Sequence, residues 1–374
     1  MSFSSTKTTS DDLVQPSNGM KIGIDATALT HLQPTGVEVA TRELIRALLT
    51  LDQTNQYYLY TPTPLDRSWQ MFANVSNRVL PPTRRWLLSQ LGPAIHQDRL
   101  DLFWSPSNLL PFKLPARRLA TVHDLAFFHF PQAYSWRSWL MSWLTVWRAT
   151  KLATKIIAVS HHTKQDLIQK FHLPDHRVVV VPNALPQSPT VTVTPLILDD
   201  YILVVGRVET RKNPLAAIKA FALIAADYPK LQLIFAGGDG LGATSAKQLA
   251  DTLGLSHRIQ FLGFVDGETL ANLYAHARIA LFPTLYEGFG LPVLEAFQYG
   301  VPLVASDTPA VAEVAGDAAL LVEPTDTLAI GRALIRLLEE PELRTTLIEK
   351  GTLRLRQYSW ERSAEELLAV INSL

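Results

Sequence analysis

The segment IALFPTLYEGFGLPVLEAFQYGVPLVAS (279–306) predicts a strand, a loop, a helix and a second strand. Both predicted strands, 279–284 and 302–306, are short apolar runs. Pro292 stands at or near the first position of the helix, where proline is favoured. A strand–helix–strand unit joins parallel strands of one sheet. The segment therefore predicts an α/β protein with a mostly parallel sheet.

The same alternation of strand and helix runs through the rest of the chain. In the first half, the predicted strands are 21–26, 57–61, 101–106, 119–124, 155–160 and 178–182. In the second half, they are 201–206, 231–237, 258–264, 279–284, 302–306 and 318–323. Most of these runs are rich in Val and Ile, as expected of strands covered on both faces. We therefore expect two Rossmann-like domains of mostly parallel sheet with helices on both sides.

The length of the chain also favours two domains, because 374 residues exceed the roughly 250–300 that one core supports. A proline-rich stretch, 186–200, is the predicted linker between domains at 20–185 and 201–358. Residues 1–19 are Ser/Thr/Asp-rich and predict a flexible tail. The segment 359–374 begins with a serine N-cap and predicts an amphipathic helix that crosses back to the first domain.

Composition excludes several classes of function. The 34 basic and 34 acidic residues cancel, which argues against a nucleic-acid partner. The chain contains no cysteine, so disulfides, zinc–thiolate sites and thiol catalysis are excluded. The polar N-terminus does not have the apolar segment of a secretory signal, and no run reaches the ~18 apolar residues of a membrane span. We expect a cytoplasmic protein that at most touches the inner face of a membrane.

Ligands of such sheets bind beyond the carboxyl ends of the strands. The loop after 279–284 carries Glu287, Gly288 and Gly290, and Glu295 lies one turn into the following helix. The glycines allow close approach of the backbone, and the helix N-terminus suits a phosphate or a sugar hydroxyl. A pair of acidic residues can also simply favour a helix N-terminus. The combination of glycines, proline and strand end favours a binding site.

Cations follow the first predicted strand of the second half. Arg207 and Lys212 flank a strand-to-helix turn and could clamp a diphosphate, although Arg211 between them also fits a solvated basic turn. His123 ends a strand of the first half. A single histidine in such a place is more often structural.

These motifs resemble family 4 of the retaining glycosyltransferases, which have the GT-B fold. Glu287 and Glu295 enclose seven residues, which matches the E-x7-E motif of that family, and the resemblance covers most of the chain. It implies that Glu287 faces the donor sugar and that Glu295 binds the ribose of the nucleotide. It also implies that Arg207 and Lys212 bind the donor diphosphate and that His123 lies beside the donor sugar and the acceptor.

The resemblance further implies what the chain binds. The expected donor is a nucleoside diphosphate sugar, such as GDP-mannose or UDP-glucose, and the expected acceptor is a hydroxyl of a glycan or a lipid-linked sugar. Donor-binding groups are expected at Gly36, Gly288, Phe289, Gly290 and Leu291. Many members carry a further glycine after the position of Gly36, where this chain has Val37. No cofactor and no metal are expected, because the chain has no Asp-x-Asp triplet to hold one.

Two other functions fit parts of the sequence. The glycine turn at 238–243 could belong to an NAD-linked oxidoreductase. The other alternative is a non-catalytic protein that binds sugar nucleotides, and the intact set of candidate site residues argues against it. A further feature is the spacing of Trp136, Trp139, Trp143 and Trp147 on one side of a predicted helix. This stripe favours packing against the domain's own sheet, and the alternative is an interfacial membrane face or an acceptor groove.

Overall fold

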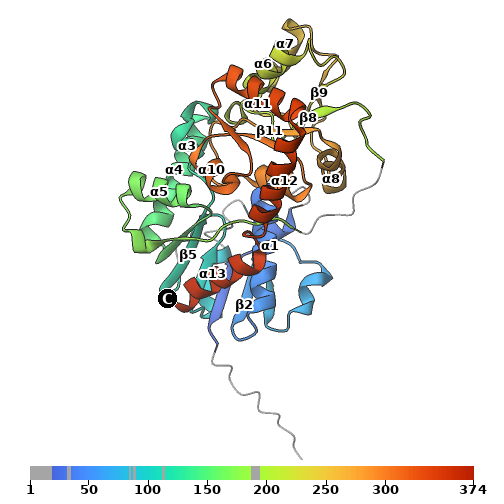
Figure 1. Cartoon of the computed structure of the whole chain (residues 1–374). Coiled ribbons are helices and arrows are strands. Elements are labelled where there is room, and N and C mark those ends of the chain that lie inside the picture. Colours follow the sequence, from blue (N-terminus) through green and yellow to red (C-terminus); the bar gives the residue numbers. More distant parts are fainter. Residues whose placement is uncertain (1–18, 32–34, 84–85, 87–89, 112–113, 187–193) are drawn as a thin grey trace, which may run out of the picture.

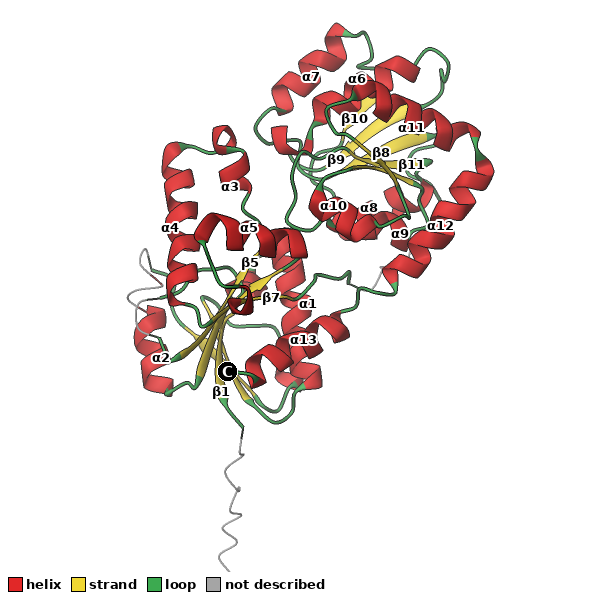
Figure 2. Ribbon diagram, turned by 60° about the vertical axis from the view of Figure 1, so that its left-hand side comes forward, coloured by secondary structure: helices red, strands yellow, loops and turns green. Residues whose placement is uncertain are grey.

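The computed structural model describes residues 19–31, 35–83, 86, 90–111, 114–186 and 194–374. It contains two α/β domains, one above the other (Figures 1 and 2). Each is built on a parallel sheet, as the sequence predicts. The predicted tail (1–19) lies almost entirely outside the described residues, as does the first half of the predicted linker.

The first sheet has seven strands in the order β3-β2-β1-β4-β5-β6-β7. They are β1 (Lys21–Asp25), β2 (Gln56–Thr61), β3 (Val75–Val79), β4 (Leu102–Ser105), β5 (Arg117–Val122), β6 (Lys155–Ala158) and β7 (Val178–Val180). All six predicted strands of this half are present. The seventh, β3, was not predicted because its sequence, VSNRV, is mostly exposed at the sheet edge and contains little apolar signal.

The second sheet has six parallel strands in the order β10-β9-β8-β11-β12-β13. They are β8 (Tyr201–Val205), β9 (Gln232–Ala236), β10 (Ile259–Phe261), β11 (Ile279–Phe282), β12 (Leu303–Ser306) and β13 (Leu320–Val322). The order of strands reverses between β8 and β11, which are neighbours. Loops that leave the carboxyl ends of β8 and β11 therefore diverge to opposite faces of the sheet and leave a crevice between them.

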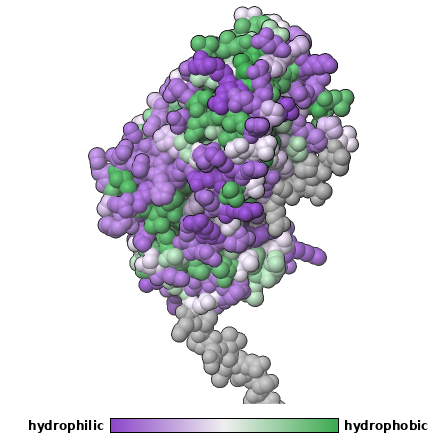
Figure 3. Space-filling model, in the orientation of Figure 1, coloured by the Kyte–Doolittle hydropathy of each residue, from purple (hydrophilic) through white to green (hydrophobic). Residues whose placement is uncertain are grey.

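Helices cover both faces of each sheet (Figure 2). In the first domain they are α1 (Gly36–Leu51), α2 (Gly92–Asp98), α3 (Ala126–His129), α4 (Trp136–Leu152) and α5 (His161–Phe171). In the second they are α6 (Pro214–Ile224), α7 (Ala243–Thr252), α8 (Gly267–His276), α9 (Leu291–Gln298), α10 (Pro309–Ala315), α11 (Thr327–Glu339) and α12 (Pro341–Leu355). Hydrophobic residues on the face of Figure 3 occur in small groups between hydrophilic ones.

The last helix, α13 (Trp360–Asn372), lies beside α1 of the first domain (Figures 1 and 2). Its N-cap is Ser359, whose side chain accepts a hydrogen bond from the main-chain N–H of Arg362. Trp360 and Leu367 are buried in the same apolar cluster as Ile45 of α1. The chain therefore crosses between the domains twice, once through 186–200 and once just before α13.

The tryptophan stripe divides along α4. Trp139 and Trp143 are partly buried and pack against the core of the first domain, whereas Trp136 and Trp147 are exposed. The exposed side also carries Leu140, Met141 and Leu144. Packing on the sheet thus accounts for only half of the stripe. Among the described residues, no helix is long and apolar enough to cross a membrane.

Candidate active site

The site begins where β8 and β11 end side by side. After β8, the chain forms a single 3₁₀ turn, Thr210–Lys212, and Asn213 then takes a left-handed conformation with φ 58° before Pro214 opens α6. After β11, the loop from Pro283 to Gly290 leads into α9, where Gly290 is the N-cap with φ 113° and Pro292 lies in the first turn. Glycine adopts this φ without strain. Each loop therefore leads directly into a helix, and each helix has a proline in its first turn.

Glu287 is the centre of this site. The residue is 9% exposed, and its carboxylate is held by cations from the β8 loop. Lys212 Nζ lies 2.6 Å from Oε1, and an Arg211 guanidinium nitrogen lies 3.0 Å from Oε2. The Thr284 hydroxyl also donates to Oε1, at 2.9 Å. Burial by itself would raise the pKa of Glu287, but the charges of Lys212 and Arg211 hold it below its ordinary value. The group is therefore a carboxylate at neutral pH.

Arg211 is a site residue that sequence reasoning missed, since a solvated basic turn also explained it. Its guanidinium bridges Glu287 and Glu209, with 2.9 Å to the Glu209 carboxylate, and donates to the Tyr286 carbonyl at 3.0 Å. Burial alone would lower the pKa of Arg211, but Glu287, Asp124 and Glu209 raise it. The sequence offers one weak signal for this role, which is Glu209, an acidic residue two positions before Arg211.

Arg207 lies apart from Lys212. It is exposed, and its Nε donates to the Asp239 carbonyl at 3.1 Å. With Thr210 and Arg211 it lines a cavity of about 360 Å³ between the domains, opposite Tyr134 and Ser138 of the first domain. The two predicted diphosphate ligands therefore lie on one loop, with Lys212 turned to Glu287 and Arg207 turned to this cavity.

Glu295 has a different environment from Glu287. It lies in α9, and its carboxylate accepts a hydrogen bond from the Tyr274 hydroxyl at 2.7 Å. Burial raises its pKa, and the Tyr274 hydrogen bond and the charge of Lys212 only partly oppose this. Tyr274 is buried in α8, where sequence reasoning reads it as an ordinary core residue.

The two glycines of the motif differ in what they permit. A Cβ on Gly288 would lie 1.8 Å from the carbonyl oxygen of His123, so only glycine lets the loop approach the first domain there. Gly290 supplies the left-handed cap of α9. Phe289, between them, is buried and packs edge-on against Tyr358 with ring centroids 5.7 Å apart. The structure thus makes Phe289 a packing residue of the loop.

His123 contacts the second domain through its main chain. Its Nε2–H donates to the Pro106 carbonyl at 2.8 Å, and Nδ1 has no hydrogen-bond partner among the described residues. Burial lowers the pKa of His123, although the Pro106 carbonyl and Asp124 partly oppose this. The imidazole is therefore neutral, with Nδ1 as an acceptor for a hydroxyl.

Gly36 opens α1 and faces the start of α9. A Cβ on Gly36 would lie 3.3 Å from Cδ1 of Leu291. The Thr35 side chain and Glu38 form a capping box that fixes the first turn of α1. Two helix N-termini, one from each domain, therefore lie close together, which favours a bound anion.

The glycine turn after β9 has a packing explanation. A Cβ on Gly237 would lie 2.1 Å from the carbonyl oxygen of Gly206, and a Cβ on Gly240 would lie 2.9 Å from the Glu209 side chain. These glycines let the turn lie against the Arg207 loop. In the described parts of the chain, no three His, Asp or Glu side chains are grouped to hold a metal ion.

Comparison with known proteins places this geometry in a family. Residues 198–354 match Glycosyl transferases group 1, and residues 34–187 match Glycosyltransferase Family 4. The O-antigen chain mannosyltransferase B of Escherichia coli is 30% identical over 307 residues, which cover 78% of this chain and 77% of that protein. A D-inositol 3-phosphate glycosyltransferase of Corynebacterium urealyticum is 34% identical over 180 residues, 46% of this chain and 42% of that protein. The chain belongs to the group 1 glycosyltransferases.

Solved structures agree on the fold. Sucrose-phosphate synthase from Thermosynechococcus elongatus superposes with a TM-score of 0.71 at 20% identity, covering 95% of this chain and 98% of that one. WaaG, a glycosyltransferase involved in lipopolysaccharide biosynthesis, gives 0.71 at 14% identity, covering 94% and 99%. The fold is GT-B, and the protein is a glycosyltransferase. The oxidoreductase alternative is therefore wrong.

The ion pairs of Glu287 predict a pH-dependent stability. Its folded pKa lies below the ordinary value of 4.5, so its stabilising effect is present above that pH and is lost as the pH falls toward the folded pKa. We expect Glu287→Gln to destabilise the protein by about 3 kcal/mol at pH 7, the scale for removing one partner of a buried pair. Chemical unfolding of both proteins from pH 8 to 3 should show this difference shrinking below about pH 4.5.

Glu349→Gln, on the exposed side of α12, is the control. A difference that stays constant to pH 3 would contradict the ion-pair account.

Proposed function

We propose that the protein transfers a hexose from a nucleoside diphosphate sugar to a hydroxyl of a glycan or a lipid-linked sugar, with retention at the anomeric carbon. The observation that carries the proposal is the Glu287 carboxylate, ionised between Lys212 and Arg211 at the end of β11. A charged carboxylate close to two helix N-termini suits a reaction in which the sugar becomes positive as a negatively charged diphosphate leaves.

The proposed donor is GDP-mannose. The support is that several relatives are named mannosyltransferases, among them the E. coli O-antigen enzyme, which matches 78% of this chain. Those names also support a polysaccharide acceptor. UDP-glucose is the other donor to be tested.

The proposed roles follow from the environments of the side chains. Lys212 and Arg207 stabilise the diphosphate, Glu295 accepts hydrogen bonds from the ribose, and neutral His123 accepts from a sugar hydroxyl. Glu287 stabilises positive charge on the donor sugar.

In the proposed same-face reaction, the acceptor oxygen bonds to the anomeric carbon on the face from which the diphosphate leaves. The bond from that carbon to the diphosphate oxygen breaks, and the departing oxygen takes the acceptor proton. The donor nucleotide is released as the diphosphate.

A panel of sugar nucleotides tests this function directly. A donor at 100 times its Kd should stabilise the protein by about 2.7 kcal/mol, and the product sugar should keep its anomeric configuration by NMR. A protein that is stabilised by a donor but neither hydrolyses nor transfers it would instead be a non-catalytic binder. No response to any nucleotide sugar would refute the proposal.

Substitutions separate the proposed roles. Lys212→Ala should lower kcat by roughly 10²–10³-fold, the scale for losing one preorganised charge. Glu295→Ala should instead raise the donor KM with little change in kcat, because the ribose does not change during the reaction. Lys350→Ala, whose partner Asp317 lies on the surface, is the matched control. A Lys212→Ala enzyme with wild-type turnover would remove Lys212 from the site.

Activity should survive an excess of EDTA. Lys212 and Arg207 are the proposed ligands of the diphosphate and supply its positive charge, so no role is assigned to a metal ion. Initial rates of donor hydrolysis should agree within about twofold with and without chelator, less than the loss of one charge stabiliser would produce. Loss of activity with EDTA that Mg²⁺ or Mn²⁺ restores would overturn this part of the proposal.

The exposed side of α4 fits peripheral contact with the inner face of a membrane that holds lipid-linked acceptors. Trp136 is 70% exposed and Met141 62% exposed, and the Arg137 guanidinium lies over the Trp136 ring at 5.3 Å. Exposed aromatic and apolar side chains next to basic ones favour binding to anionic lipid headgroups.

Sedimentation with vesicles tests this contact. Binding to phosphatidylglycerol vesicles should exceed binding to phosphatidylcholine vesicles, and the double variant Trp136→Ser/Met141→Ser should weaken it by about tenfold or more. Leu328→Ser, at a 57% exposed position of α11, should leave binding unchanged. Equal binding by all three proteins would exclude α4 as the contact.

A further inference from the structure

The loop that carries Glu287 is bound on its other side by α5 of the first domain. The carbonyl of Gly288 accepts hydrogen bonds from the side chains of Ser160, at 2.6 Å, and Thr163, at 3.0 Å. Both hydroxyls are completely buried. The residue directly after Glu287 is therefore fixed by the first turn of a helix from the opposite domain.

The residue directly before Glu287 is fixed in the same way. The Tyr286 hydroxyl donates to Asp166 of α5 at 2.9 Å and accepts from the main-chain N–H of Leu125 at 3.1 Å. The ring stacks on His129 with centroids 4.5 Å apart, and His129 Nε2 lies 2.9 Å from the same Asp166 carboxylate. Tyr286 is 5% exposed, yet all these partners belong to the first domain. Its side chain is thus buried by the other domain as well as by its own.

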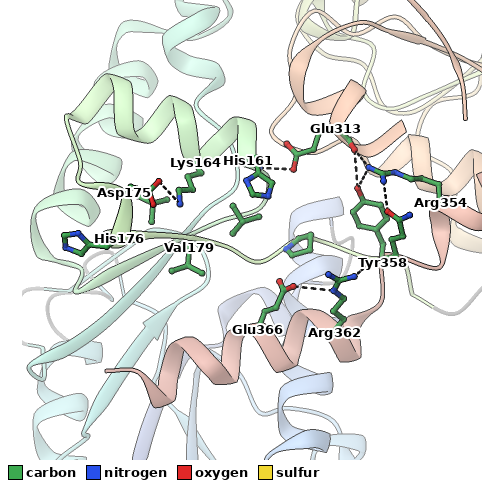
Figure 4. Close-up of a pocket in the computed structure, with 14 residues that line it drawn as sticks. His161, Lys164, Asp175, His176, Val179, Glu313, Arg354, Tyr358, Arg362 and Glu366 are labelled. Atoms are coloured by element: carbon green, nitrogen blue, oxygen red, sulfur yellow. Dashed lines mark hydrogen bonds and ion pairs between the residues drawn. The ribbon is translucent and has the colours of Figure 1, made fainter. Parts of the chain in front are cut away.

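A third contact between the domains also involves α5, but it lies at a distance from the Glu287 loop. Glu313 of α10 accepts the main-chain N–H groups of His161 and His162 at 2.9 and 3.1 Å. Figure 4 shows Glu313 directed at the start of α5, with Arg354 and Tyr358 behind it. This contact aligns the two domains, but it does not touch the loop. The contacts of Tyr286 and Gly288, by contrast, directly link the position of the domains to the residues on either side of Glu287.

We propose that Tyr286 is a positioning residue for the transfer reaction, whose hydroxyl fixes Glu287 against the donor sugar only when the two domains are in contact. This inference rests on the proposed function of Glu287. Lys212 and Arg211 set the charge of the carboxylate, and Tyr286 sets its place relative to His123, which belongs to the domain that Tyr286 enters. When the domains separate, Tyr286 loses Asp166 and Leu125, and the loop keeps only its contacts within the second domain.

Tyr286→Phe removes the hydroxyl and keeps the ring, so the stacking on His129 remains. We expect kcat for hydrolysis of GDP-mannose or UDP-glucose, which requires no acceptor, to fall about ten- to hundredfold, the scale for a misplacement of about 1 Å. The Kd of GDP or UDP, measured by calorimetry, should change by less than twofold, because Glu295, Lys212 and Arg207, the proposed contacts of the ribose and the diphosphate, lie in the second domain. A residue that merely stabilised the fold would not separate kcat from nucleotide affinity.

Tyr201→Phe is the matched control. The Tyr201 hydroxyl donates to the Leu273 carbonyl at 2.7 Å within the core of the second domain. The Tyr201→Phe substitution should lower thermal stability without lowering kcat. Asp166→Ala provides a second test. If Asp166 and Tyr286 act through one hydrogen bond, kcat of the double variant Asp166→Ala/Tyr286→Phe should be no lower than kcat of the slower single variant.

A measurement without substrate completes the test. The chain contains no cysteine, so cysteines placed at the exposed Met71 and Leu253 allow spin labels on one site in each domain. In Tyr286→Phe the distribution of distances between the labels should broaden relative to wild type and Tyr201→Phe. An unchanged distribution, or an unchanged kcat in an active enzyme, would overturn the role of Tyr286.

A wild-type protein that neither binds nor hydrolyses any donor would refute the proposed function, while a broadened distribution would still support the domain contact.

Discussion

The site depends on the burial of one carboxylate. Glu287 is 9% exposed, and a charge in that position is costly unless cations neutralise it. Lys212 and Arg211 do so from a different loop, which is possible because β8 and β11 are neighbours in the sheet. The strand order thus brings together charges that are about seventy-five residues apart in the chain. Thr284, which follows β11, donates a further hydrogen bond to the same carboxylate.

The same carboxylate explains why the surrounding backbone is rich in glycine. The loop must carry Glu287 toward the cations on one side and approach the first domain on the other. At Gly288 the approach is so close that any Cβ would collide with the His123 carbonyl, and at Gly290 the chain must turn with a positive φ into α9. The glycines of the turn after β9 serve a similar purpose, since they let it lie against the loop of Arg207. Close approach of backbones is thus a common requirement of the site.

The sequence predicted the strands well, because a parallel strand covered by helices is apolar on both faces and short apolar runs identify it. It missed β3, whose residues are mostly exposed at the edge. It also indicated the loops after β8 and β11 that carry Lys212 and Glu287, and the helix that carries Glu295. What it could not predict were partners chosen by tertiary structure. Arg211 reads as a surface cation, and Tyr274 and Tyr286 read as core aromatics, until the fold brings a carboxylate to each. Likewise, the spacing of the α4 tryptophans identified a helix but not which of them face the core.

The two glutamates of the E-x7-E motif have different surroundings, which shift their pKa values in opposite directions. Glu287 is kept ionised by two cations, whereas Glu295 is buried with a neutral tyrosine hydroxyl as its direct partner, so its pKa rises. Such divergence between neighbouring carboxyl groups usually separates an electrostatic role from a hydrogen-bonding one. A permanent negative charge suits Glu287 to a sugar that becomes positive as its bond to phosphate breaks. Glu295 gains most from the hydroxyls of a diol, because each hydrogen bond donated to the carboxylate offsets part of the cost of its burial. The spacing of seven residues therefore matters less than what each carboxylate contacts. Glu287 lies in the loop after β11 beside the cations of the neighbouring loop, and Glu295 lies one turn into α9, where the Tyr274 hydroxyl is its hydrogen-bond donor.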